Sequence, residues 1–371
     1  MPKPRVRFQI QPTVSHYREP LIRQLLRSGR LAMEVVGRFS NSEAGEAERI
    51  ESASEDVLRR AAPVRTLSVG QWWWQVGDAA AVWRGGYDAY VLEGRFYTVS
   101  AWAAGAVGKL RGRRVFLWGH GWKRPEAGAK RLTRLMLYRL ADGLLVYGDR
   151  AKELGVEYGV PAEKIQVVYN SLYSECALAE PEEPTGEDTD PPTLIYSSRL
   201  TARHRLDSLA EALAHWPENR PRPRVIVVGD GSERPRLERL FAEKQVKAEF
   251  LGAVYDYDRL RQLYAQADLA LSVGGAGLNV IQALSFGVPV VAEAGSPDSS
   301  PEIEAVVEGE TGRYYDGTAS HLRTVLAETL SDRVRLRELG RRGVGLVRGR
   351  YTAERHAEAI EEGILRLISD R

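Results

Sequence analysis

Short apolar runs alternate with helical patterns along most of the chain. In the first half the runs VRFQI, AMEVVG, DAYVLEG, RVFLWG, GLLVYG and IQVVYN are typical of buried strands. In the second half TLIYSS, RVIVVG, AEFLG, LALSV, PVVAEA and GRYYD repeat the arrangement. Short apolar strands separated by helices are typical of parallel sheets whose two faces are both covered. The pattern therefore predicts an α/β fold.

One segment interrupts this alternation. Residues 176–192, CALAEPEEPTGEDTDPP, are rich in Pro, Glu and Asp and poor in bulky apolar residues, which is the composition of a solvated linker. The linker separates a first domain, residues 1–175, from a second domain, residues 193–351. Residues 352–371 predict a last amphipathic helix, which we expect to join the first domain. Two such strand and helix series indicate two Rossmann-like domains with parallel sheets facing across a cleft.

The composition is that of a globular protein, with 43% apolar and 27% charged residues. Cys176 is the only cysteine, so neither a disulfide framework nor a cysteine-based metal site can form within the chain. The six histidines show no metal-ligand spacing, and we expect no bound metal and no cofactor. The N-terminus lacks the apolar run of a signal peptide, and no segment reaches the roughly 18 apolar residues of a membrane span. A cytoplasmic location is expected.

Charge is distributed unevenly between the two halves. Residues 1–175 contain 27 Lys and Arg against 18 Asp and Glu, a balance of +9, and the remainder contains 25 against 32, a balance of −7. The basic half indicates an anionic partner, such as a membrane surface or a phosphorylated acceptor, or else a solvated arginine-rich surface with no partner. Nucleic acid is not an expected partner.

Two stretches of the basic half bear on a membrane contact. The helical stretch 128–140, GAKRLTRLMLYRL, either forms an interfacial amphipathic face or buries its leucines in the core. The three tryptophans of residues 71–75, QWWWQ, are core, a platform for a sugar, or an interface. Peripheral contact with the inner face of a membrane is therefore one hypothesis.

The segment 271–291, LSVGGAGLNVIQALSFGVPVV, predicts a strand, a glycine-rich turn, a helix and a second strand. Small residues leave the backbone N–H groups of such a turn unobstructed, and the helix N-terminus adds partial positive charge. A diphosphate is expected to bind there, at Gly275, Ala276, Gly277 and Leu278. Arg199 follows the buried strand TLIYSS and is placed to neutralise the same diphosphate.

Further motifs follow in a fixed order: LIYSSRLTARHRLDSLAEAL, VIVVGDGSERPRLERL, FLGAV, LRQLYAQADLALSV, and GLNVIQALSFGVPVVAEAG with the later EAVVEGETGRYYD. Together they resemble the C-terminal signature of retaining glycosyltransferases of the GT-B fold, family 4 (glycosyl transferases group 1). In the first half LWGHG, ADGLLVYGDRAKEL and GVPAEKIQVVYNSLY are similar to the family's His-containing loop and the run into its linker. The resemblance implies the GT-B fold and transfer of a sugar, with retention, from a nucleotide-diphosphate sugar to a glycan, glycolipid or small-molecule acceptor.

The resemblance also implies how the second domain would bind the donor. Arg199 and the basic turn at Arg203 and His204 would hold the diphosphate. The family usually has a lysine at the position of His204, so the second cation is either Arg203 or a protonated His204. The nucleoside would be met by residues from three segments, namely Gly229, Ala253, Val254 and Gln282.

In the first domain the resemblance points to two loops. His120, between the glycines of LWGHG, would hydrogen-bond the sugar, and with Arg199 it is a candidate catalytic residue. A structural histidine is the alternative. His16, Tyr17 and Arg18 replace the glycine pair that the family often has in its first strand-to-helix loop. They would shape an acceptor pocket, or else cap the following helix.

The family's two acidic residues are absent. By alignment they fall on Gly274, which offers only backbone, and on Gln282, which can bind a ribose through neutral hydrogen bonds worth roughly 1 kcal/mol each. The chain resembles a subset of the family with a neutral turn at this place, which favours altered chemistry. Two rival functions remain open: a non-catalytic nucleotide-sugar-binding or scaffold protein, and a GT-B nucleotide-sugar epimerase.

Overall fold

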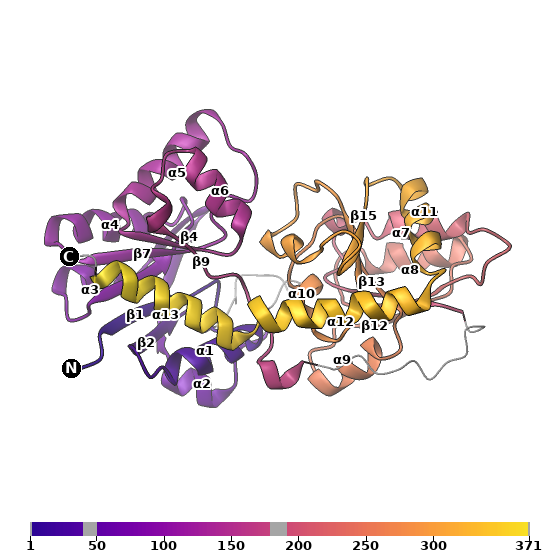
Figure 1. Ribbon diagram of the computed structural model, residues 1–371. Helices are drawn as coiled ribbons and strands as arrows, with labels where there is room; N and C mark the ends of the chain where they lie inside the picture. The colour runs from indigo at the N-terminus through magenta and orange to yellow at the C-terminus, as the bar shows by residue number, and fades with distance from the viewer. Residues whose placement is uncertain (1, 40–49, 179–190, 370–371) are drawn as a thin grey trace. The chain divides into compact units, whose positions relative to one another are not determined.

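A computed structural model describes residues 2–39, 50–178 and 191–369 (Figure 1). The chain divides into two compact units. Unit 1 comprises Met1–Ser174 together with Thr352–Arg371, and unit 2 comprises Glu175–Tyr351. Residues 179–190 of the predicted linker lie outside the described residues.

Unit 1 is built on a seven-stranded parallel sheet in the order β3-β2-β1-β6-β7-β8-β9. The strands are β1 (Arg5–Ile10), β2 (Ala32–Gly37), β3 (Ala62–Pro63), β6 (Ala89–Glu93), β7 (Arg114–Gly119), β8 (Gly143–Val146) and β9 (Ile165–Val167). A separate antiparallel hairpin consists of β4 (Thr66–Val69) and β5 (Trp72–Gln75). Six of the seven sheet strands coincide with the apolar runs of the first half, so those predictions are confirmed.

Helices cover both faces of this sheet. The α-helices are α1 (Glu19–Leu26), α2 (Glu55–Arg60), α3 (Asp78–Arg84), α4 (Val99–Arg111), α5 (Gly128–Leu140), α6 (Asp149–Glu157) and α13 (Ala353–Ser369); short 3-10 turns are η1 (His16–Arg18) and η3 (Ala162–Lys164). Alternate residues of a strand point to opposite faces, so Val91 and Phe116 pack with α1 and α13, whereas Tyr90 and Leu117 pack with α3, α4 and α5. This double burial is why most positions of these strands are apolar.

Unit 2 repeats the plan with a six-stranded parallel sheet in the order β12-β11-β10-β13-β14-β15. Its strands are β10 (Thr193–Ser197), β11 (Arg224–Val228), β12 (Ala248–Gly252), β13 (Leu269–Ser272), β14 (Val290–Glu293) and β15 (Gly312–Tyr315). All six were predicted from apolar runs, and their presence confirms the predictions.

The helices of unit 2 are α7 (Asp207–Ala214), α8 (Arg234–Glu243), α9 (Tyr257–Tyr264), α10 (Leu278–Ser285), α11 (Ala319–Thr329) and α12 (Arg333–Arg350), with the 3-10 turns η4 (Glu175–Ala177), η5 (Ala202–His204) and η6 (Pro301–Ala305). Helices α7, α8 and α11 share a core with one face of the sheet. Helix α10 lies against β13 and β14, and α12 packs on α10.

The strand order of each sheet reverses once, between β1 and β6 in unit 1 and between β10 and β13 in unit 2. In doubly wound sheets ligands bind beyond the carboxyl ends of the strands at such a reversal. In unit 2 this place lies between the turn that follows β10 and the turn that follows β13. None of the described helices combines the length and apolar character that a membrane crossing requires.

Candidate functional site

The turn between β13 and α10 has its backbone donors held by side chains. The N–H of Gly274 donates to Glu293 Oε2 over 3.1 Å, that of Ala276 to Ser299 Oγ over 3.1 Å, and that of Gly277 to Asn279 Oδ1 over 2.9 Å. A diphosphate seated on this turn would therefore replace the Ser299 and Asn279 contacts at Ala276 and Gly277. The fourth residue of the expected cradle, Leu278, is the first residue of α10.

Arg203 lies beside this turn, and Arg199 lies close enough to His204 for its charge to act on that ring. Both side chains are exposed, and within the described part of the chain neither guanidinium makes a hydrogen bond or an ion pair to another side chain. A Cβ atom at Gly274 would come within 2.5 Å of the Arg203 carbonyl oxygen, so the η5 backbone packs directly on the turn. Two positive charges without carboxylate partners, next to a helix N-terminus, form an electrostatic environment suited to an anion.

His204 differs from its two arginine neighbours. Its ring is buried, and Nδ1 bonds the hydroxyl of Thr201 at 2.8 Å. Burial lowers the pKa of His204 to about 4, and the positive charges of Arg203 and Arg199 act in the same direction. The imidazole is therefore neutral at pH 7, which leaves Arg203 rather than a protonated His204 as the second cation.

Gln282 lies on α10 and points toward β10. Its side-chain oxygen accepts hydrogen bonds from the hydroxyls of Ser197, at 2.7 Å, and Tyr264, at 3.1 Å. Both lone pairs of this oxygen are thus engaged. A ribose hydroxyl bound at this oxygen would take the place of one of the two hydroxyls.

Glu293 is a site residue that sequence reasoning missed. It ends β14 with its side chain buried, and besides Gly274 N–H it accepts from the hydroxyl of Tyr315 at 3.2 Å. Its Oε1 pairs with Arg205 Nη1 at 3.2 Å. Burial raises the pKa of Tyr315, and the nearby Glu293 carboxylate adds to the effect. An acid that closes an apolar run, PVVAE, was the only signal in the sequence.

The carboxylate of Glu293 lies beside Gly274, the position at which the family resemblance predicts an acid. Gly274 has a φ of 77°, which side-chain-bearing residues rarely adopt, and a Cβ there would also meet the His204 carbonyl carbon at 2.5 Å. A glutamate at this position would be strained and would require the neighbouring η5 backbone to move. The negative charge beside the turn comes from Glu293 at the end of β14 and from Asp298, which packs on Gly275 and whose charge acts on His204.

The residues expected to meet the nucleoside end two further strands. Gly229 follows β11, and its N–H donates to the carbonyl of Gly252 at the end of β12. Ala253 and Val254 follow β12, with Ala253 exposed. The chain thus brings the predicted donor residues to the carboxyl edge of the unit 2 sheet, where the resemblance requires them.

In unit 1, His120 follows β7 at the same edge of its own sheet. Its ring meets the edge of Tyr147 with centroids 5.1 Å apart. Burial lowers the pKa of His120 well below its usual value, and four nearby cations add to the effect: Lys123, Arg95, Arg18 and Arg134. A neutral imidazole can both donate and accept a hydrogen bond, as recognition of a sugar hydroxyl requires.

The loop after β1 contains the predicted acceptor residues. Arg18 is buried, and its guanidinium donates to the Gln11 carbonyl, to Asn170 Oδ1 and to the Tyr147 hydroxyl. Arg18 therefore acts from within the fold, joining this loop to the ends of β8 and β9. His16 and Tyr17 are half-buried and pack edge to face, with ring centroids 5.5 Å apart.

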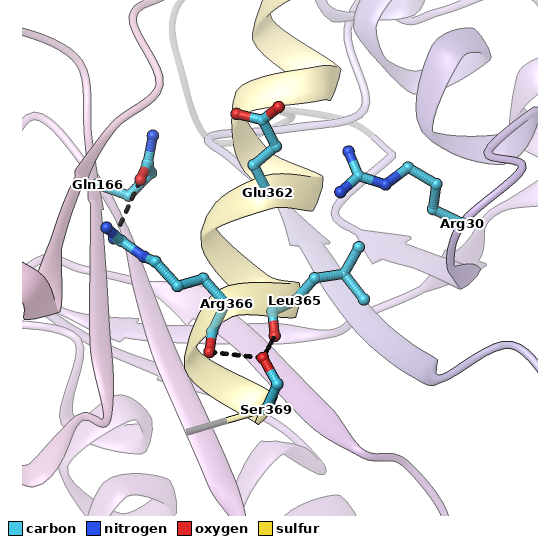
Figure 2. A pocket seen from close by; sticks show the side chains of 6 residues that line it. All are labelled: Arg30, Gln166, Glu362, Leu365, Arg366 and Ser369. Atoms are coloured by element: carbon cyan, nitrogen blue, oxygen red, sulfur yellow. Dashed lines mark hydrogen bonds between the residues drawn. The ribbon is translucent and has the colours of Figure 1, made fainter. Parts of the chain in front are cut away.

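Two other observations concern possible ligands. Within residues 2–39, 50–178 and 191–369, no group of three or more His, Cys, Asp or Glu side chains is arranged to hold a metal ion. Figure 2 shows a shallow depression of about 470 Å³ in unit 1, where Arg366 of α13 donates to Gln166 of β9 and Glu362 lies opposite Arg30. Arg30 precedes β2, so this depression lies toward the amino edge of the sheet, away from the predicted site residues.

Comparison with known proteins agrees with this architecture. The structure of Anabaena HepE in complex with UDP superposes with a TM-score of 0.71 at 18% identity, covering 97% of this chain and 98% of that one. The chain therefore has the GT-B fold, with two parallel α/β domains, and the predicted fold class is confirmed.

The family comparison concerns mainly unit 2. Residues 179–344 match the family described as glycosyl transferases group 1. A GDP-mannose-dependent monoacylated alpha-(1-6)-phosphatidylinositol monomannoside mannosyltransferase of Corynebacterium glutamicum is 30% identical over 174 residues, 44% of each chain. The sulfoquinovosyl transferase SQD2 of Arabidopsis thaliana is 32% identical over 152 residues, 39% of this chain and 28% of that protein. The matches span less than half of either relative, and they support the family resemblance.

Proposed function

We propose that the protein is a glycosyltransferase that moves a hexosyl group from a nucleotide-diphosphate sugar to a glycan, glycolipid or small-molecule acceptor. The observation that supports this most directly is the pair Arg199 and Arg203, two cations without side-chain partners beside the N-terminus of α10. Unit 2 would bind the donor. Unit 1, with His120 and the loop at His16, would bind the acceptor.

The proposed transfer proceeds with retention of anomeric configuration. The bond between the anomeric carbon and the diphosphate oxygen breaks, and the acceptor oxygen bonds to the anomeric carbon on the same face. The acceptor proton passes to the departing diphosphate, so no carboxylate nucleophile is required. Arg199, Arg203 and the helix N-terminus stabilise the charge that develops on the diphosphate, which is the dominant catalytic contribution in this scheme.

Two further residues would orient the donor. The neutral His120 would hydrogen-bond a hydroxyl of the transferred sugar. The amide of Gln282 would bind the ribose. The relatives named above include a GDP-mannose-dependent enzyme, and the superposed HepE structure contains UDP, so GDP and UDP are the nucleotides to test first.

Thermal unfolding in the presence of UDP, GDP, ADP, CDP, dTDP and their sugar conjugates tests donor binding. A ligand at about a hundred times its dissociation constant should stabilise the protein by roughly 2.7 kcal/mol. Arg199→Ala should weaken binding of that nucleotide by roughly ten- to a hundredfold, because a charge-assisted hydrogen bond contributes about 1.5–3 kcal/mol. Arg239→Ala, on the exposed face of α8, removes the same charge away from the turn and should leave binding unchanged. Equal affinity of the Arg199 variant and the wild type would refute the diphosphate assignment.

A non-catalytic donor-binding protein is the second candidate. The engaged N–H groups of Gly274, Ala276 and Gly277, and the missing glutamates, favour it. Such a protein would bind a nucleotide sugar, yet neither transfer the sugar to any acceptor nor hydrolyse it slowly to free sugar. Slow hydrolysis of the bound donor, followed by NMR of the anomeric product, would support the enzyme and report retention.

A further inference from the structure

The hairpin β4–β5 presents an exposed and entirely apolar face. In its register Leu67 pairs with Trp74 and Val69 with Trp72. Residues directly opposite in an antiparallel pair point to the same side, as do residues two apart in a strand, so these four side chains share one face. Their exposed fractions are 46%, 40%, 80% and 47%, respectively. A contiguous apolar face of this kind usually marks an interaction site.

The opposite face attaches the hairpin to unit 1. Trp73 stacks against the guanidinium of Arg38, 5.1 Å from the ring centroid, and against that of Arg95 at 5.4 Å. The side chain of Gln75 is buried, with Nε2 donating to Glu93 Oε2 and the backbone N–H accepted by Ser100 Oγ. The hairpin is thus held on the body of unit 1 while its apolar face remains exposed.

The same part of the chain concentrates positive charge. Between Arg59 and Arg139 there are 15 Lys and Arg against 4 Asp and Glu, a balance of +11. Three of the four acids, Asp78, Glu93 and Glu126, have side chains at most 6% exposed and paired with arginine. Four of the basic residues pair with acids just outside the stretch, namely Arg59 with Glu55, Arg60 with Asp56, and Lys109 and Arg114 with Asp142. The outward-facing charge of this part of unit 1 is therefore smaller than +11, but it remains mainly basic.

Exposed apolar side chains collect in this basic stretch as well. Of the fourteen large apolar residues that are exposed in the described part of the chain, ten lie between Leu67 and Met136. Strand β5 packs on α4, and α4 packs on α5, whose Leu132 and Met136 are 57% and 52% exposed. Helix α5 buries Leu135, whereas Leu132 and Met136, one turn apart, remain exposed. The layer formed by the hairpin, α4 and α5 is thus continuous through direct contacts between successive elements.

We propose that this layer, with the face formed by Leu67, Val69, Trp72 and Trp74 at its centre, docks the protein on the surface of an anionic lipid bilayer. Tryptophan and arginine together are suited to the boundary between acyl chains and charged headgroups. Basic residues near such a surface contribute about 1 kcal/mol each.

Other occupants fit the surface less well. A second copy of the chain would bring two strongly basic patches together, which costs free energy in an isologous interface. A glycan requires polar partners for its hydroxyls, and Leu67 and Val69 provide none. The bilayer satisfies both the apolar and the charged component.

The hairpin follows β3, and its Gln75 contacts Glu93 at the carboxyl end of β6. The hairpin therefore lies at the sheet edge that contains the predicted acceptor residues. If the proposed function holds, on which this last step rests, the acceptor is a lipid-linked molecule taken up from the membrane. The docking itself depends only on the hairpin and its charge.

Vesicle co-sedimentation of the full chain tests the proposal. Wild type should sediment with vesicles of equal parts phosphatidylcholine and phosphatidylglycerol, not with phosphatidylcholine alone, and added salt should weaken binding. Trp72→Ser with Trp74→Ser should lower the partition coefficient at least about tenfold, because the substitutions remove most of the insertable apolar area. The control, Tyr255→Ser with Val334→Ser, removes two exposed apolar side chains from unit 2 and should bind as wild type does.

The thermal midpoint and the nucleotide-induced shift of the tryptophan variant should match those of the wild type, which separates docking from folding and from donor binding. The proposal is overturned if wild type ignores anionic vesicles or if the tryptophan variant binds them unchanged. It is also overturned if sedimentation velocity reveals a dimer that the variant dissociates. Vesicle binding without any nucleotide binding would uphold docking and reject the proposed function.

Discussion

The buried Glu293 carboxylate offers the sharpest test of how the turn at Gly274 is held. Replacing Glu293 by Ala leaves two donors without an acceptor, the N–H of Gly274 and the hydroxyl of Tyr315. An unsatisfied buried polar group costs about 1–3 kcal/mol. The lost pair with Arg205 adds at most about 1 kcal/mol, since that side chain is 48% exposed. We therefore expect Glu293→Ala to lower the free energy of unfolding by roughly 3–5 kcal/mol.

Glu293→Gln is the matched variant, because the amide keeps one acceptor oxygen of the same reach and loses only the charge. Its expected cost is about 1–2 kcal/mol. Urea unfolding followed by tryptophan fluorescence and by circular dichroism measures both variants and reveals whether the two units unfold together. In the nucleotide titration both variants should also bind more weakly than wild type, in the same order.

A double-mutant cycle with Tyr315→Phe decides whether the hydrogen bond is the cause. In the wild-type background this substitution removes a satisfied hydroxyl and should destabilise. In the Glu293→Ala background it removes an orphaned hydroxyl and should be neutral or stabilising. The resulting coupling should be about 1–2 kcal/mol. Additive effects of the two substitutions, or a loss below about 1 kcal/mol for Glu293→Ala, would refute this account of the turn.

Three other predictions follow from the same structure. The substitution Gly274→Glu should destabilise unit 2 by at least about 2 kcal/mol in urea unfolding and should abolish nucleotide binding, since a Cβ at φ 77° meets the Arg203 carbonyl; wild-type stability would contradict this. Burial lowers the pKa of His120, His204 and His356, so their neutral rings contribute full stability above about pH 6.5. Below about pH 6.5 the free energy of unfolding should fall by up to about 1.4 kcal/mol per pH unit for each histidine, as urea unfolding at several pH values would reveal. A flat pH profile would count against neutral buried rings. We expect EDTA to leave nucleotide binding and any transferase activity unchanged. A loss of either on adding EDTA, reversed by a divalent cation, would overturn that expectation.

The sequence predicts the secondary structure of both sheets with few errors. Twelve apolar runs coincide with strands, because a strand buried on both faces is mostly apolar and this requirement is local; the buried Arg7 and Gln9 of β1 are exceptions. The strands that no apolar run predicted are β3 and the two strands of the hairpin β4–β5. QWWWQ mixes one inward tryptophan with two outward ones, so its composition alone does not distinguish core from interface.

The candidate site is only partly predictable for a related reason. Motif order identifies the segments that reach the carboxyl edge of the unit 2 sheet, and these include Arg199, Arg203 and Gln282. The identity of their contacts is not contained in the motifs. Gln282 is engaged by Ser197 and Tyr264, which come from a strand and a helix elsewhere in the chain. Arg18, expected at an acceptor pocket, is bonded to Asn170 across 152 positions of sequence.

By itself, then, the sequence determined the two α/β units, the strands that build them, the glycine turn and the uneven charge, since these follow from local periodicity and composition. Tertiary structure decided which groups satisfy the N–H donors of the turn, among them the Glu293 carboxylate that accepts from Gly274. It also decided that Leu67, Val69, Trp72 and Trp74 share one exposed face. Hydrogen-bond partners and exposed faces depend on which distant segments meet, and that is a property of the folded chain rather than of any single stretch of it.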